Sequence, residues 1–182
     1  VRDLLDSSEL SIHNAVDRMW LIASSMLEDA VEALAEDDAD LARDVTQRDD
    51  DVDRLYMVVS RIFRATLRSP TAAEELGLPR ETCFDYHSSA RQLERVADHA
   101  TKIAHLSLEL EGTPPAEVTE SLRELRASAS AVIEDAMAAL VADENEEAIR
   151  LANGARERVQ ELDANAREID ELLRELDPAR AQ

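Results

Sequence analysis

Four acidic residues form two pairs whose spacing could build a metal site. Asp49 and Asp53 lie four residues apart in one segment, and Glu94 and Asp98 lie four apart in another. Residues four apart share one face of an α-helix, so each pair would present two carboxylates on the same side. Carboxylates that converge without a counter-charge repel one another, and a cation held between them relieves that repulsion. The pattern therefore predicts one or two divalent or ferric ions, held between two helices by these four side chains.

Two other interpretations fit the same residues. The chain is acidic throughout, so an acidic pair can simply be a solvated face, and we prefer this interpretation for Asp50 and Asp51. Alternatively, nearby arginines could neutralise the carboxylates through charge-assisted hydrogen bonds, and Arg48, Arg91 and Arg95 are placed to do so. The residue pattern leaves both alternatives open for the metal site.

The elements that must position these residues are long helices. Apolar residues recur at alternating spacings of three and four along five segments, which is typical of amphipathic helices. Aromatic residues make up only 3% of the chain and Gly numbers 3, which argues against a β-sheet fold. We therefore expect an all-α protein, an antiparallel bundle or bundles of about five helices packed side by side. The expected helices span approximately 8–37, 39–68, 80–111, 116–142 and 144–176.

The chain also contains an internal repeat. The segment Met26–Leu34 reads like Val132–Leu140, and each is followed by an acidic turn and another helix. With one residue inserted, Val52 and Leu55 align with Val159 and Leu162, so the last two helices look like a second copy of the first two. We expect a first three-helix repeat over 1–112 and a second, incomplete repeat of two helices over 113–182.

The second copy differs from the first in two ways that bear on function. Arg156 and Gln160 occupy the positions that match Asp49 and Asp53, so we expect the metal site only in the first copy. The second copy also lacks a third helix, and something must cover its apolar side. The first copy, missing sequence or a second molecule could do so, and this predicts self-association, with a homodimer as the expected form.

Charge and composition limit the classes of partner. The net charge is −21 and Lys102 is the only lysine, so direct binding of nucleic acid by this segment is not expected. An acidic, lysine-poor surface suits molar salt, where charges are screened over about 3 Å, and this predicts a halophilic source. We see no signal peptide and no apolar run long enough to cross a bilayer, so we expect a cytoplasmic location without membrane insertion.

Two motifs resemble those of the PhoU family of phosphate-signalling proteins. They are Asp49-x-x-x-Asp53 and the segment Arg91–Ala100, which reads RQLERVADHA. The resemblance also covers the repeated helical layout. It implies a three-helix-bundle repeat fold, multinuclear metal sites with iron, zinc, nickel or magnesium as candidates, and Asp49, Asp53, Glu94 and Asp98 as ligands. It further implies dimerisation and repression of phosphate uptake through the Pst phosphate transporter. The family's haloarchaeal members often carry an AbrB-like DNA-binding domain before this region, and a start at Val1 fits removal of such a domain.

We consider three candidate functions for this chain. The first is a non-enzymatic, metal-binding regulator of phosphate uptake or of phosphate-responsive gene expression. The second is a helical dimerisation or scaffold module without metal. The third, a ferritin-like di-metal oxidase, requires Glu-x-x-His pairs, and the chain has none, since Ala97 stands three residues after Glu94. No nucleophile triad, phosphate loop or nucleotide fingerprint supports another enzyme class.

Overall fold

Five helices make up the part of the chain that the computed structural model describes, which is residues 11–69, 71, 74, 77–142 and 144–176. Within those residues there is no strand, and the predicted all-α bundle is confirmed. The beginning of the first expected helix, at 8–10, lies outside the described residues. The helices are α1 (Ile12–Glu36), α2 (Ala39–Arg68), α4 (Arg80–Glu109), α5 (Ala116–Val141) and α6 (Asn145–Leu176).

Side-chain caps explain how α1 and α2 form a tight hairpin. Ser11 begins α1 by accepting a hydrogen bond from the Asn14 N–H, and Asp37 ends it in the left-handed conformation, with φ of 57°. Asp38 then caps α2 by accepting from the Asp40 and Leu41 N–H groups, both at 3.0 Å. Only two residues separate the helices, so they must run antiparallel.

The three helices α1, α2 and α4 enclose the main core. Large side chains of α1 and α2 point inward, and several of them are completely inaccessible to solvent. Half of the buried residues of α4 are alanines, which allow close approach to its neighbours. The core includes Met19, Met26, Val45, Val52, Val59, Leu93, Ala97 and Ala100.

The helices α5 and α6 form a second hairpin with much less buried surface. Val118, Thr119 and Met137 are buried on α5, whereas among the described side chains of α6 only Ala155 and Ile169 are buried. The apolar stripe expected along the last helix is therefore largely uncovered, because α6 packs mainly against α5. The side chains of Leu173 and Leu176, expected at the end of this stripe, lie outside the described residues.

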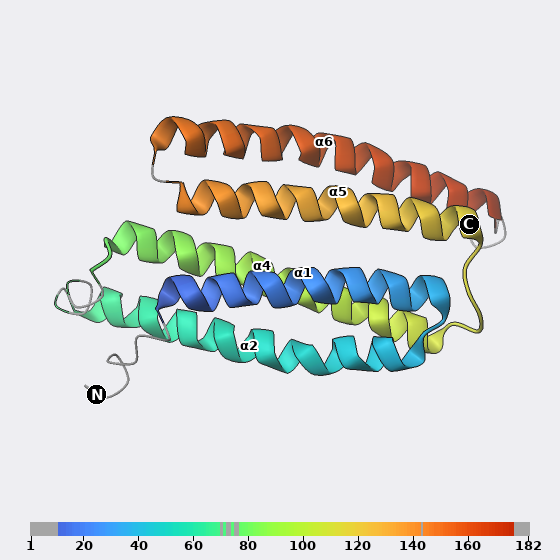
Figure 1. Ribbon diagram of the computed structural model, residues 1–182, viewed down its shortest axis with the longest axis horizontal. Coiled ribbons are helices and arrows are strands. Elements are labelled where there is room, and N and C mark those ends of the chain that lie inside the picture. The colour runs from blue at the N-terminus through green and yellow to red at the C-terminus, as the bar shows by residue number, and fades with distance from the viewer. Residues whose placement is uncertain (1–10, 70, 72–73, 75–76, 143, 177–182) are drawn as a thin grey trace.

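Figure 1 shows this hairpin lying along one side of the three-helix unit, with α6 outermost. Arginines of α5 join it to an acidic row on α1. Arg123 pairs with Glu32 and Glu36 at 2.7 Å each, and Arg126 lies 3.7 Å from Glu28. The hairpin is thus attached through α1, by ion pairs as much as by apolar contact.

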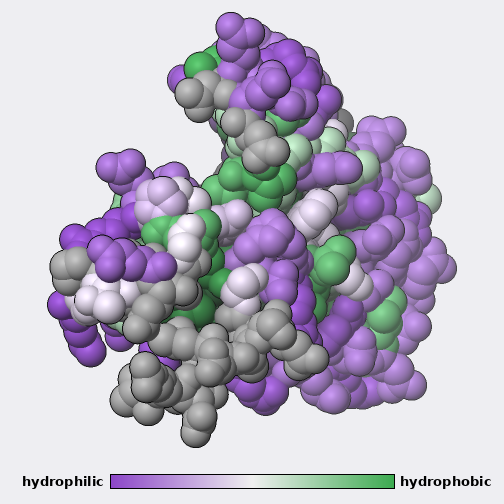
Figure 2. Space-filling view, turned by 60° about the vertical axis from the view of Figure 1, so that its left-hand side comes forward, coloured by the Kyte–Doolittle hydropathy of each residue, from purple (hydrophilic) through white to green (hydrophobic). Residues whose placement is uncertain are grey.

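The surface is hydrophilic over most of the face in Figure 2, and apolar side chains gather in the hollow below the hairpin. A cavity of about 520 Å³ lies between α1 and α5, lined in part by Trp20, Leu21, Met137 and Val141. No helix in the described part of the chain combines the length and the apolarity that a membrane span requires.

Candidate metal site

The four predicted ligands face one another across the contact between α2 and α4. Asp49 and Asp53 come from α2, and Glu94 and Asp98 come from α4, and these two helices pack side by side. Partial burial raises the pKa of Asp49, and the charges of Asp53 and Asp98 raise it further. Burial alone can raise a carboxylate pKa, but the contribution from neighbouring carboxylates requires that they lie close. The structure therefore brings Asp49 near a residue of each predicted pair.

Glu94 shows the same effect from the other helix. Partial burial is the main cause that raises its pKa, followed by the charges of Asp98 and Asp53 and, more weakly, Asp49. Arg91 acts in the opposite direction and lowers this pKa. Each carboxylate of the set thus influences Glu94, and the four residues form one electrostatic cluster, which we call the carboxylate cluster.

Arg48 does not neutralise the carboxylate cluster. Its guanidinium points to α1, where Nη2 lies 2.6 Å from the Asp29 carboxylate and Nη1 donates to the Ser25 hydroxyl at 3.0 Å. Its Nε also lies 3.0 Å from Asp44. This bridge between α1 and α2 explains why an arginine interrupts the apolar stripe of α2, which the spacing alone did not reveal.

The other two arginines, Arg91 and Arg95, neutralise little of the negative charge of the carboxylate cluster. Arg95 donates to the side chain of Gln92 at 3.4 Å, and Arg91 acts on Glu94 only from a distance. Within the described residues, no cationic group lies within 4 Å of any of the four carboxylates. Neutralisation by arginine, the main competing interpretation, therefore has no ion pair to support it.

A buried hydroxyl beside the carboxylate cluster also lacks a partner. Thr101 Oγ1, one turn after Ala97 on α4, is shielded from solvent and makes no hydrogen bond within the ordinary distance. It is nevertheless close enough to Asp49 to favour the charged carboxylate and so to lower its pKa. A buried polar atom without a partner is unfavourable, and a ligand bound in the cluster would give it one.

These donors suit a hard cation. Carboxylate and hydroxyl oxygens are the ligands preferred by magnesium, and carboxylates also bind iron and zinc. No three His, Cys, Asp or Glu side chains among the described residues are already arranged as a ligating group. The carboxylates would thus have to rotate toward a common centre, a movement that their mutual repulsion opposes until a cation is present.

The second repeat offers no comparable site. Arg156 and Gln160, which match Asp49 and Asp53, are both exposed on α6. Any site built from this pattern is therefore confined to the three-helix unit.

Comparison with known proteins identifies the family of the three-helix unit. The family described as "PhoU domain" matches residues 16–107, which include all four carboxylates and half of the chain. This chain belongs to the PhoU family. The matched segment covers most of α1, all of α2 and almost all of α4, so the PhoU domain here corresponds to the three-helix unit.

Proteins similar to this PhoU chain include two that are each named "Phosphate-specific transport system accessory protein PhoU homolog". The one from Clostridium acetobutylicum is 25% identical over 142 residues, which cover 77% of this chain and 63% of the relative. The one from Xylella fastidiosa strain Temecula1 is 32% identical over 161 residues, which cover 87% of this chain and 62% of the relative. The matches thus span less than two thirds of either relative. No solved structure matches the chain significantly.

The C-terminal half of α2 carries arginines that our sequence analysis did not single out. Arg61, Arg64 and Arg68 line a surface cavity of about 450 Å³. A signal for them is present in the sequence, because no acidic residue occurs between Asp53 and Glu74 in a chain with 41 acidic residues.

Proposed function

We propose that this chain is a non-enzymatic, metal-binding regulator of phosphate uptake or phosphate-responsive gene expression, acting in the cytoplasm as a homodimer. The observation that carries the proposal is the carboxylate cluster, which lies within the PhoU domain and has no cationic partner within the described residues. Similar proteins are named as accessory proteins of a phosphate-specific transport system. The partners we propose are accordingly components of the Pst phosphate transporter.

A bound cation would supply positive charge at the α2–α4 contact, with iron, zinc, nickel or magnesium as candidates. Asp49, Asp53, Glu94 and Asp98 would hold it through their carboxylate oxygens. Burial and neighbouring carboxylates raise the pKa values of Asp49 and Glu94, so their charged forms oppose the metal-free fold at neutral pH. Occupancy of the site would reverse that effect and hold α2 against α4.

Support for a dimer comes from the second hairpin. Ile149 and Val159 of α6 are 61% and 42% exposed, and Val141 at the end of α5 is 46% exposed. Exposed apolar side chains on an otherwise hydrophilic helix are typical of surfaces that associate. A second copy of the chain would cover the face that α6 leaves open.

The first test is metal content, measured by elemental mass spectrometry on gently purified protein. We expect near-stoichiometric metal in the wild-type chain and loss of that metal in Asp53→Asn and Glu94→Gln. These substitutions keep the size of each side chain and remove only its charge. Asp50→Asn is the matched control, because Asp50 is exposed on the same helix and lies near Arg54 rather than in the cluster. It should keep its metal.

Thermal unfolding with and without a chelator provides a second readout. We expect the chelator to lower Tm in the wild type and in Asp50→Asn, and to leave Tm unchanged in the two cluster variants. Absence of metal after incubation with iron, zinc, nickel and magnesium would overturn the metal part of the proposal. The chain would then be a helical dimerisation module, and sedimentation analysis of its mass would test that role separately.

A further inference from the structure

The cavity beside the three arginines of α2 points to a second binding site. We propose that Arg61, Arg64 and Arg68 bind a tetrahedral oxyanion of the phosphate class, either free phosphate or the phosphate group of a monoester. We call these residues, with Ser60 and Tyr56, the arginine site. It lies at the opposite end of α2 from the turn to α1, and it shares no residue with the carboxylate cluster.

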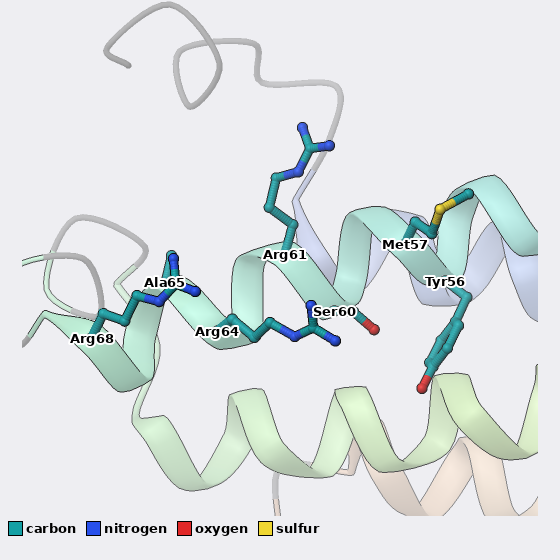
Figure 3. A pocket seen from close by; sticks show the side chains of 7 residues that line it. All are labelled: Tyr56, Met57, Ser60, Arg61, Arg64, Ala65 and Arg68. Carbon is teal, nitrogen blue, oxygen red and sulfur yellow. The ribbon is translucent and has the colours of Figure 1, made fainter.

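The arginine site is organised along one line of the helix. Tyr56, Ser60, Arg64 and Arg68 follow one another at intervals of four, so they share a face of α2. Figure 3 shows the Arg64 side chain running along the helix toward Ser60, while Arg61 rises from the other side. Together they line a cavity of about 450 Å³, large enough for a phosphate group. Forked guanidinium groups beside two hydroxyl groups are well suited to a tetrahedral oxyanion.

The charges around the arginine site favour an anion. At least eight other arginines of the chain lie within 4 Å of an Asp or Glu: Arg43, Arg48, Arg54, Arg123, Arg126, Arg150, Arg158 and Arg174. Among the residues that the structure describes, Arg61, Arg64 and Arg68 have no such partner. Near physiological salt, charges are screened over about 8 Å, so the distant acidic surface does not cancel the local positive field.

The positive charge of the arginine site also affects the pKa of a neighbouring histidine. His87 of α4 stacks on Phe63 and Tyr56 of α2, with ring centroids 4.7 and 5.8 Å apart. Burial lowers the pKa of His87, and the charges of Arg64 and Arg91 lower it further. The arginine site thus adjoins an aromatic stack, and no acidic residue in the described part of α4 forms an ion pair within 4 Å with its arginines.

A purely structural role explains only part of this arrangement. Arg68 lies in the last turn of α2, where a positive charge interacts favourably with the helix dipole. The dipole effect does not extend to Arg61 and Arg64, because it falls off within one turn. Both are exposed and offer their donors to solvent, in a stretch of α2 that carries no acidic residue after Asp53.

Calorimetric titration of inorganic phosphate and of phosphoserine into the full chain, at constant ionic strength, tests the proposal. We expect saturable binding of at least one of them, and acetate serves as the carboxylate control. Arg64→Gln and Arg61→Gln should each weaken binding by roughly tenfold, because one charge-assisted hydrogen bond contributes about that factor. Arg43→Gln is the matched control, since it removes the same charge from an exposed arginine of α2 that pairs with Asp40, and it should bind like the wild type.

Each outcome of the titration either supports or overturns the arginine site. Tighter binding of phosphoserine would identify a monoester as the ligand, tighter binding of inorganic phosphate would identify the free anion, and either supports the arginine site. No saturable binding, equal binding of acetate, or equal weakening in Arg43→Gln would overturn it. Circular dichroism of each variant checks that α2 still folds. The metal analysis involves different residues, so failure of either proposal leaves the other in place.

Discussion

The two hairpins of this protein have similar sequences but differ sharply in burial. In the hairpin of α1 and α2, Val52 is completely buried, whereas Val159, which matches it in the hairpin of α5 and α6, is 42% exposed. The difference arises from α4, which packs against both α1 and α2 and completes their core. The second hairpin has no such third helix within the described chain. An amphipathic stripe thus specifies a face that can be buried, and the presence of a partner determines whether it is.

The arginine bridges show the same contrast. Asp29 and Asp135 match in the repeat, and each pairs with an arginine of the following helix, namely Arg48 and Arg158. Arg48 is enclosed between two helices of a packed unit, with a side chain only 22% exposed, whereas the Arg158 side chain is 48% exposed. The same type of Asp–Arg ion pair therefore occurs in the packed three-helix unit and on the more exposed second hairpin.

The strongest test of this contrast is to make the same substitution at matched positions. Val52→Ala should lower the free energy of unfolding by about 2 kcal/mol, because it removes buried apolar volume and leaves a small cavity. Val159→Ala should change it by less than about 0.5 kcal/mol, because the side chain is already partly solvated and alanine favours the helix. Urea unfolding followed by circular dichroism measures both values. Equal losses would show that a partner covers α6 in solution.

A smaller effect is expected at Gly154, in the interior of α6. A Cβ at this position would meet the Asp135 carboxylate at 3.8 Å, which is an ordinary contact. Gly154→Ala should therefore raise the stability of the second hairpin by about 0.5–1 kcal/mol, through the better helix propensity of alanine. Ala152→Gly, at an exposed position of the same helix, should lower it by a similar amount. A destabilising Gly154→Ala would mean that another chain approaches α6 closely there.

The smallest effect concerns the attachment of the second hairpin. Arg123→Gln should speed hydrogen exchange in α5 and α6 by about threefold while leaving α2 and α4 unaffected, since partly exposed ion pairs contribute little. Arg150→Gln is the control, because Arg150 lies near Glu147 within α6 itself. If exchange speeds up equally in all helices, the two regions unfold as one unit.

This attachment should also depend on pH. The hydrogen bond from Arg123 lowers the pKa of Glu32 below its ordinary value of 4.5. A lowered carboxylate pKa stabilises the fold above that ordinary value, and the contribution is lost as the pH falls through the lower, folded-state pKa. The difference between wild type and Arg123→Gln should therefore be full at neutral pH and shrink below about pH 4.5. A difference that persists well below this pH would exclude Glu32 as the responsible partner.

Much of the fold was predictable from the sequence because helices leave local signals. Apolar spacing located the five helices that the structure describes. The uncovered face of α6 was harder to foresee, because spacing reports which residues can be buried and not what covers them. The proximity of the four carboxylates was predictable from paired i, i+4 spacing, and whether they bind metal remains a prediction. The role of Arg48 was not predictable, because its partner Asp29 lies on another helix.

The connection between the two regions is short and stiff. Only Leu110 to Pro115 separate α4 from α5, Gly112 has a φ of 83°, and two prolines follow it. A short tether raises the effective concentration of the second hairpin beside α1 without any new contact. A contact too weak to join two free molecules is sufficient under that condition. The linker thus holds the second hairpin close to the three-helix unit, and cleavage of a single peptide bond there would remove that constraint.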